Sequence, residues 1–201
     1  MKTILMLLIL LPVIAQASTQ KLVVTLANKS TIHGKLQFWQ YGHNRWRKVG
    51  DEIPVVIGKN GSAYNKKEGD NKTPLGTFPL DFVFGFSKPK TSMPFLKLQP
   101  DTTCVDDVQS ANYTKIVNNK TAKGEKMYTY KHVYRFGMLI NYNQNPVVKG
   151  KGSCVFMHIW RGANIGTAGC VAMKPKNLLW ILRKLKPKQH PVMQIRLNSV
   201  H

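Results

Sequence analysis

The chain has 201 residues, which is enough for one domain with a sizeable apolar core and too few for two domains of ordinary size. Its 30 basic and 9 acidic residues give a formal net charge of +21, which favours acidic partners: nucleic acid, an anionic membrane, a wall polymer or acidic peptides. The lysines are dispersed along the sequence, which is more typical of a solvated charged surface than of one specific binding patch.

The N-terminus has the pattern of a secretory signal peptide. A single Lys2 precedes an apolar run and then an Ala-Gln-Ala sequence ending at Ala17, where cleavage is expected. A membrane anchor is the alternative, but the run is shorter than the roughly 20 apolar residues of a span, and Pro12 interrupts it. We therefore predict a signal peptide at 1–17, one domain at 18–201, and an exported protein of the periplasm or cell envelope. Because the protein is expected to be exported, nucleic acid is the least expected of the acidic partners.

The next part of the chain is rich in β signals. Short runs of branched or alternating apolar residues predict strands, and Gly42 begins the turn of an expected hairpin. Turn-forming residues are dense at 68–77, and no apolar pattern with the helical period occurs before residue 175. The strands predicted in this part are 22–26, 35–41, 53–57 and 78–84.

The middle of the chain, at 104–124, is polar and irregular and predicts a lid or a surface insertion. We interpret Asp106 and Asp107 there as turn residues, because neighbours on an extended chain point apart. One helix is predicted, with Pro175 in its first turn and Pro187 ending it. Its apolar stripe consists of Leu178, Ile181, Leu182 and Leu185, and strands are predicted at 133–140, 154–158 and 191–197.

The chain has three cysteines, Cys104, Cys154 and Cys170. In an oxidising compartment two of them can form a disulfide and one thiol remains free, and a bridge between the first two would leave Cys170 as that free thiol. The sequence does not fix the pairing, and three free buried thiols are the alternative. The six histidines are scattered without the spacing of metal ligands, so we predict no metal site.

The stretch from Val155 to Met173 contains the parts of a Cys/His nucleophilic site. A thiolate is the reactive form of cysteine, and an imidazole such as that of His158 can lower the thiol pKa of Cys170. Gly169 leaves room for a carbonyl to approach backbone N–H donors. The alternative is a structural role for both residues, in which Cys170 is a small buried core residue and His158 finds its hydrogen-bond partners within the fold. On these residues alone the two interpretations are equally good.

Two motifs in a fixed order favour the first interpretation. His158 followed by Thr-Ala-Gly-Cys at 167–170 resembles the signature of the L,D-transpeptidase catalytic domain family, with its YkuD-like fold. The upstream Thr-Pro-x-Gly-x-Phe segment at 73–78 is similar to a second motif of that family. The segments 54–61 and 104–107, together with Gly152-Ser153, resemble a subgroup carrying Thr-Ala-Gly-Cys. The similarity covers residues 21–197.

The resemblance implies a mainly β fold, a YkuD-like β-sandwich with one amphipathic helix after the catalytic cysteine, and a catalytic domain at 18–201. It implies that Cys170 attacks a peptidoglycan stem peptide at the bond between meso-diaminopimelate and the following D-amino acid. His158 would activate the thiol and protonate the leaving amine, and the backbone N–H groups of Gly169 and Cys170 would bind the oxyanion. No metal or cofactor is implied.

The acyl acceptor stays open at this point. An amine would make the protein a transpeptidase, and water would make it an L,D-carboxypeptidase or amidase. A non-catalytic, cationic wall-binding protein on the same fold is a further alternative. Peptidoglycan is the expected partner in each case, with anionic wall or envelope polymers as a second class.

Two positions depart from the family signature. Ala168 replaces a histidine, although its backbone carbonyl could still orient His158, and Ala172 replaces an arginine or asparagine that would position substrate. We expect substrate contacts from neighbouring side chains instead, and the candidates are Trp160, Arg161 and Thr167.

Overall fold

A computed structural model describes residues 17–198. The predicted signal peptide lies outside the described residues except for its last residue, Ala17. The fold is mainly β with one α-helix in the described range, α1 (Pro175–Lys184), as predicted. No helix within residues 17–198 is long and apolar enough to cross a membrane.

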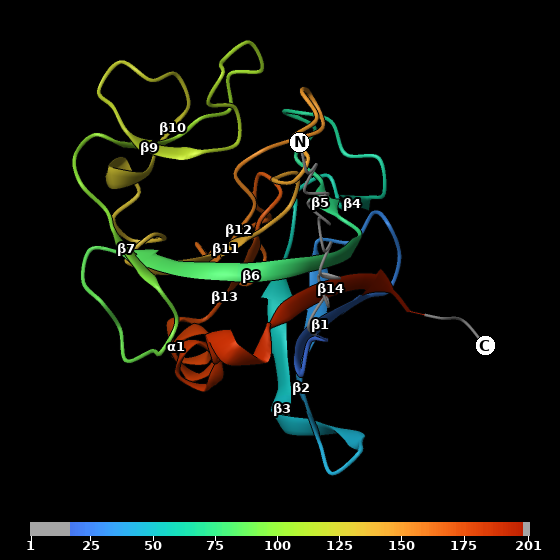
Figure 1. Ribbon diagram of the computed structural model, residues 1–201. Helices are drawn as coiled ribbons and strands as arrows, with labels where there is room; N and C mark the ends of the chain where they lie inside the picture. Colours follow the sequence, from blue (N-terminus) through green and yellow to red (C-terminus); the bar gives the residue numbers. More distant parts are fainter. Residues whose placement is uncertain (1–16, 199–201) are drawn as a thin grey trace, which may run out of the picture.

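The principal sheet of the described chain has nine strands in the order β11-β12-β13-β3-β2-β1-β14-β6-β7. Strand β11 also pairs with β6, so the sheet folds back on itself and encloses one core (Figure 1). In chain order these strands are β1 (Gln20–Leu26), β2 (His33–Gly42), β3 (Arg45–Val56), β6 (Gly76–Gly85), β7 (Phe95–Lys97), β11 (Phe136–Ile140), β12 (Phe156–Ile159), β13 (Val171–Met173) and β14 (Val192–Leu197).

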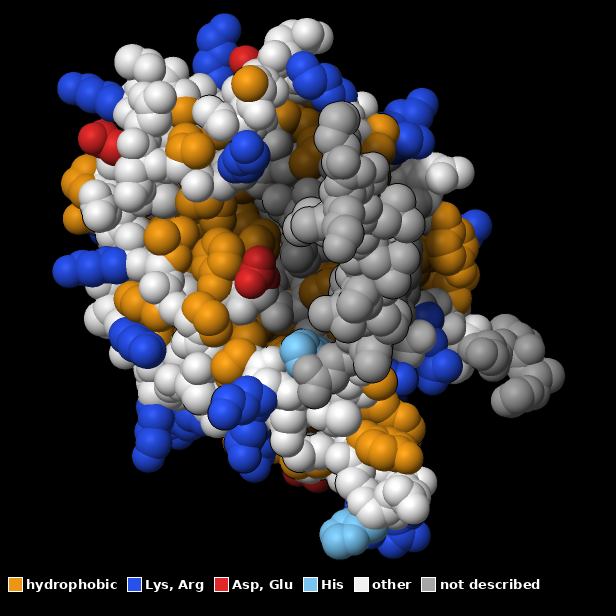
Figure 2. Space-filling model, in the orientation of Figure 1, with side chains coloured by type: hydrophobic (Ala, Val, Ile, Leu, Met, Phe, Trp, Pro, Cys, Tyr) orange, Lys and Arg blue, Asp and Glu red, His pale blue; other side chains and the backbone are white. Residues whose placement is uncertain are grey.

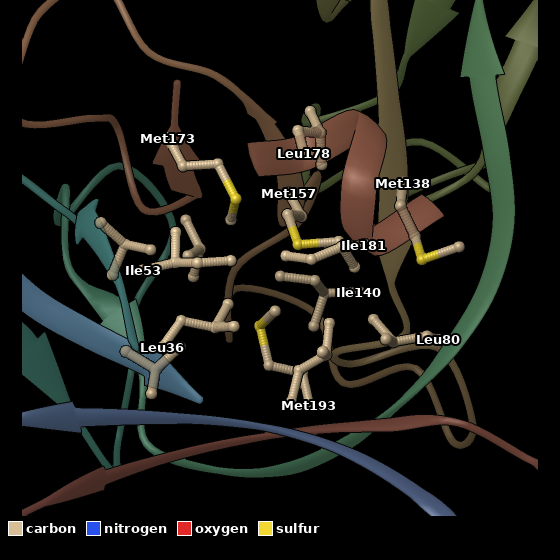
Figure 3. Packing of buried hydrophobic residues seen from close by; sticks show 14 of the residues in the cluster. Leu36, Ile53, Leu80, Met138, Ile140, Met157, Met173, Leu178, Ile181 and Met193 are labelled. Carbon is tan, nitrogen blue, oxygen red and sulfur yellow. The ribbon is translucent and has the colours of Figure 1, made fainter. Parts of the chain in front are cut away.

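The main core lies between the sheet and helix α1. Alternate strand residues point inward, because successive side chains of a strand lie on opposite faces. Leu178 and Ile181 of the helix pack on them, and Met157 and Met193 fill the space between (Figure 3). Pro175 occupies the first turn of α1, and Arg183 and Lys184 the last, as helix-terminus preferences favour.

The β2–β3 hairpin is longer than predicted. Strand β3 begins at Arg45, eight residues before the predicted 53–57, and pairs with β2 down to Gly42 (Figure 1). Its first half has no buried residue and projects beyond the core, so it carries no inward apolar alternation for a sequence pattern to reveal. The strand predicted at 133–140 begins only at Phe136, as β11, and residues 133–135 form the turn and bend before it.

A smaller layer covers the outer face of β11 and β12. The segment predicted as irregular contains part of a three-stranded sheet in the order β10-β8-β9. A second apolar cluster beneath it includes Cys104, Tyr134 and Phe156. The minor strands are β4 (Ser62–Ala63), β5 (Thr73–Pro74), β8 (Thr102–Cys104), β9 (Ile116–Asn118) and β10 (Glu125–Lys126), and the 3-10 turns are Met127–Thr129 and Pro187–Gln189.

A disulfide ties this cover to the site strand. Cys104 of β8 is bonded to Cys154, two residues before β12, and Cys170 is the free cysteine of the described chain. The pairing that the sequence left open is therefore the one that spares Cys170.

Candidate active site

His158 lies on β12, and Cys170 comes immediately before the neighbouring parallel strand β13. His158 of β12 is opposite Ala172 of β13, and Cys170 precedes that residue by two positions. Residues two apart on an extended chain share a face, so Cys170 lies on the side that carries His158, and both residues line one cavity. The residues next to them in sequence, Met157 and Val171, face the main core instead.

The imidazole of His158 has a defined tautomer. Its Nδ1 lies 2.8 Å from the carbonyl oxygen of Ile159, and a carbonyl can only accept, so Nδ1 carries the proton. Nε2 is thereby left with a lone pair. The ring of Tyr134 packs edge-on against the imidazole, with 5.4 Å between ring centroids. The orienting carbonyl is thus that of Ile159, where the sequence had offered Ala168.

Burial keeps the imidazole neutral. His158 is 8% exposed, and desolvation lowers its pKa to about 4, partly opposed by the Ile159 hydrogen bond and assisted by the positive charge of Arg161. At neutral pH the ring is therefore a base that can accept a proton at Nε2.

The thiol of Cys170 is also enclosed and neutral. Its Sγ accepts a hydrogen bond from the Phe156 N–H at 3.3 Å and donates to the Cys154 carbonyl at 3.5 Å. Burial, and then the negative charge of Glu125, raise its pKa to about 12. In this enclosed state desolvation outweighs the lowering effects of the Phe156 hydrogen bond and of the charge of Lys66 on the thiol pKa. The lowering expected from the imidazole stays a prediction.

His158 and Cys170 share a cavity of about 370 Å³. Its walls come from the loop before β5, the cover, and the chain on both sides of β12 and before β13. Charged side chains of both signs line it, and they are Lys59, Lys66, Glu68, Asp106, Glu125 and Arg161.

Two threonine hydroxyls hold the loop that carries the cysteine. Thr73, in the upstream motif, donates to the Gly169 carbonyl at 2.9 Å and accepts from the Gly58 N–H at 2.8 Å. Thr167 donates to the Cys170 carbonyl at 2.7 Å. These contacts explain physically why the two sequence motifs occur together, since one braces the other.

Gly169 has both a special conformation and close neighbours. Its φ of +138° is disfavoured for residues with a side chain, and a Cβ there would lie 2.9 Å from the Lys72 carbonyl oxygen. Its N–H donates to the Thr167 hydroxyl at 3.0 Å, so it is engaged within the loop in this state.

The candidate substrate contacts from sequence separate in space. Arg161 and Thr167 line the cavity, but the Thr167 hydroxyl is committed to its own loop. Trp160 lines a different hollow, beside Trp180 and Asn177, rather than the cavity of Cys170.

Sequence reasoning missed several polar groups of the cavity. Lys66 is 3% exposed at its side chain and pairs with Asp70 at 2.6 Å. The Tyr134 hydroxyl donates to the carboxylate of Glu125, which lies on β10 of the cover. No local pattern marks these residues, because their neighbours come from distant parts of the chain. Within residues 17–198, no group of three or more His, Cys, Asp or Glu side chains could hold a metal ion.

Comparison with known proteins adds a family match. The sequence matches the model of the L,D-transpeptidase catalytic domain, YkuD, over residues 23–193. No curated protein matches it. The fold is similar to the helical cell shape determining protein Pgp2 from Campylobacter jejuni, at 16% identity and a TM-score of 0.51, over 91% of this chain and 49% of that one. Bd1075 from Bdellovibrio bacteriovorus matches at 17% identity and a TM-score of 0.44, over 89% and 48%. This chain thus spans about half the length of those structures.

Proposed function

This chain belongs to the L,D-transpeptidase catalytic domain family, and on that premise we propose that it is an exported cysteine acyl-transferase acting on peptidoglycan stem peptides. The observation that supports this most directly is that His158 of β12 and Cys170, the residue just before β13, line one cavity. Cys170 is also the cysteine that the disulfide leaves free.

The first half of the reaction starts from two neutral groups. As Sγ of Cys170 attacks the peptide carbonyl, Nε2 of His158 takes the thiol proton, so a free thiolate need not accumulate in the buried site. The C–N bond of the tetrahedral intermediate then breaks, and the imidazolium returns that proton to the leaving amine. A thioester on Cys170 and a neutral His158 remain.

Backbone donors would stabilise the oxyanion. We assign this role to the N–H groups of Cys170 and Gly169. The Gly169 N–H has to turn from the Thr167 hydroxyl to do so, which a glycine allows more readily than other residues. Substrate entry into the cavity would accompany that change.

The second half depends on the acceptor. An amine that attacks the thioester gives a cross-linked or attached peptide, and water gives the shortened stem peptide of an L,D-carboxypeptidase or amidase. Both acceptors lose a proton to Nε2 of His158 and regenerate the Cys170 thiol. The two outcomes therefore share the residues and differ only in which nucleophile reaches the thioester.

The test is acyl-enzyme formation on defined tetrapeptide and pentapeptide muropeptides, followed by intact-protein and product mass spectrometry. The wild-type mature chain should gain the mass of the acyl fragment, and Cys170→Ala should gain none and release no product. His33→Gln, which changes an exposed histidine of β2, serves as the matched control and should behave as wild type. Turnover by Cys170→Ala would sink the proposal.

A second candidate function, binding to anionic wall polymers, has one specific observation in its favour. The β2–β3 hairpin projects from the rest of the sheet (Figure 1). It carries aromatic and cationic residues on one face, because Tyr41 is opposite Trp46 and Trp39 is opposite Lys48. Lys21 of β1 lies with its Nζ 4.2 Å from the Trp46 ring centroid. Lysine and arginine side chains are otherwise dispersed over the visible surface (Figure 2).

Binding to purified sacculi tests this candidate. Lys48→Gln should weaken binding several-fold, because it removes a cation from the aromatic face. Arg47→Gln is the matched control, since Arg47 lies on the opposite face of the same strand and carries the same charge. Equal losses in the two variants would show that diffuse charge, and not this face, holds the polymer.

A further inference from the structure

Lys66 is a buried cation beside the loop that carries Cys170. Its Nζ donates to Oδ1 of Asp70 at 2.6 Å and to the carbonyl oxygen of Lys67 at 3.3 Å. A Cβ added to Gly169 would lie 3.5 Å from this Nζ, so the ammonium is adjacent to the residue that precedes the cysteine. The acyl-transfer steps described above assign no part to this charge.

The turn that follows Lys66 keeps its partner Asp70 charged. The carboxylate of Asp70 also accepts the backbone N–H groups of Lys67 at 2.8 Å and of Lys72 at 2.9 Å. Burial by itself raises the pKa of Asp70, but the hydrogen bonds from Lys66 and from the two backbone groups outweigh it and lower the pKa below its usual value. The ammonium is therefore held in one place by a partner that stays ionised at neutral pH.

Stability is a weak reason for placing a cation here. Taking an ammonium and a carboxylate out of water costs free energy, and apolar residues of similar volume often stabilise a fold equally well. The stem of Lys66 packs closely against Gly152, where an added Cβ would lie 2.7 Å from Cε. An apolar side chain of the same shape would fill that space, so the charge indicates a role beyond packing.

The groups around the thiol of Cys170 have opposing effects on its pKa. Burial and then the charge of Glu125 raise that pKa, whereas the Phe156 hydrogen bond and the charge of Lys66 lower it. Arg161, an exposed cation of the same cavity, instead acts on the pKa of Glu125. Lys66 thus supplies positive charge that favours a negative charge on Sγ. The other titratable side chains that line the cavity are Lys59, Glu68, Asp106, Tyr130, Tyr134 and His158.

We propose that Lys66 is a positioning residue of the acyl transfer, whose fixed ammonium beside Gly169 stabilises the negative charge that develops on Cys170 and then on the carbonyl oxygen under attack. This rests on the proposed function, because it concerns the reactivity of the same cysteine. Charges that are fixed in advance in a site closed to water stabilise a developing charge without having to reorganise. Lys66 needs no contact with the substrate, because it acts across the cysteine loop, and Asp70 holds it there.

The test measures alkylation of Cys170 by iodoacetamide, a neutral reagent, between about pH 7 and about pH 9. Lys66→Met keeps the length of the side-chain stem and removes the charge. Its alkylation should be roughly 10-fold slower than that of wild type at each pH, because thiolate is the reactive form and its fraction falls as the thiol pKa rises. A merely structural role predicts the opposite, since a loosened loop would expose the buried thiol and speed alkylation.

Two further variants separate the charge from the fold. Lys67→Met removes the same charge from the neighbouring, exposed position, keeps the backbone N–H that Asp70 accepts, and should react as wild type does. The double variant Lys66→Met, Asp70→Asn leaves no carboxylate without its cation and should be slowed as much as Lys66→Met. If Lys66→Met does not fold, the double variant decides. Alkylation as fast as wild type, or faster, in the folded Lys66 variants overturns the proposal.

Acylation by defined muropeptides connects this charge to the proposed function. In Lys66→Met the acylation rate at saturating donor should fall by a similar factor, while the donor concentration that gives half the maximal rate should not change, because Lys66 does not touch the donor. A higher half-saturating concentration with an unchanged maximal rate would assign Lys66 to substrate binding and overturn the proposal. If wild type forms no acyl-enzyme with any donor, the proposed function is overturned, whereas the alkylation rates still decide whether Lys66 stabilises charge on Cys170.

Discussion

Both faces of β12 and β13 are buried, but the side chains on the two faces have different surroundings. Met157 and Val171 face the main core and need only apolar neighbours. His158, the next residue of β12, and Cys170, the residue just before β13, face a polar cavity under the cover. Successive side chains of an extended chain point to opposite faces. In each of these two segments, the residue that packs in the core is therefore the sequence neighbour of the residue that faces the cavity.

The contrast teaches what each face requires. The core face is stabilised by close packing of apolar groups, whereas the site face holds titratable groups out of water and depends on a cover to do so. That cover is held by a disulfide at Cys104 and by the hydrogen bond between Tyr134 and Glu125. Loss of the cover should therefore affect the site face before the core face.

Removing the disulfide is the strongest way to break this contrast. The bridge closes a loop with a sequence separation of 50, for which chain entropy gives about 4 kcal/mol of stabilisation. We expect the double variant Cys104→Ala, Cys154→Ala to lose about that much in urea unfolding. Its Cys170 should react faster with a thiol reagent, because the cover loosens. Unchanged Cys170 reactivity would show that packing alone holds the cover.

Truncating one residue on each face compares them directly. Met157→Ala should lower the free energy of unfolding by about 2 to 5 kcal/mol, because it leaves a cavity in the main core. Cys170→Ala removes one sulfur from the site face and should cost about 1 kcal/mol while it abolishes acylation. Equal unfolding losses in the two variants would contradict the division between the faces.

The sequence predicted those features that depend on local pattern. The apolar strands at 22–26 and 78–84 and the helix with Leu178 and Ile181 are confirmed, because burial there follows a local period. The first half of β3 was not predicted as a strand, because it pairs with its neighbour outside the core. The sequence does not show which strands pair or in which register, so the pairing of β12 with β13 is known from the structure alone.

The candidate site divides in the same way. Cys170 and His158 could be nominated because a short motif contains both residue types, although their roles stay predictions. Glu125 and Ser153 could not, because they enter the cavity from β10 and from the chain before Cys154. Lone acidic and hydroxyl residues in polar loops carry no periodic or spacing signal, and only long-range contacts identify them.

The buried histidine gives a pH test of the site face. The pKa of His158 is lowered from 6.5 to about 4, so the fold favours the neutral ring. That stabilisation is present above pH 6.5 and is lost as the pH falls toward 4, by about 3 kcal/mol at roughly 1.4 kcal/mol per pKa unit. The difference in unfolding free energy between wild type and His158→Gln should shrink by that amount over this window. A difference that stays constant over this window for His158→Gln would contradict the burial argument.

The smallest effect concerns the brace between the two motifs. Thr73→Val keeps the shape of the side chain but removes the donor to the Gly169 carbonyl and the acceptor for the Gly58 N–H. Leaving such buried groups without partners should cost about 2 kcal/mol, whereas Thr77→Val, at an exposed position of β6, should cost little. Because Gly169 precedes Cys170, the proposed nucleophile, acylation of Cys170 should slow more than stability alone explains. This is measured under conditions where both variants are fully folded. If acylation in Thr73→Val equals that in Thr77→Val, the upstream motif stabilises the domain without positioning the cysteine, and the link between the two motifs is structural only.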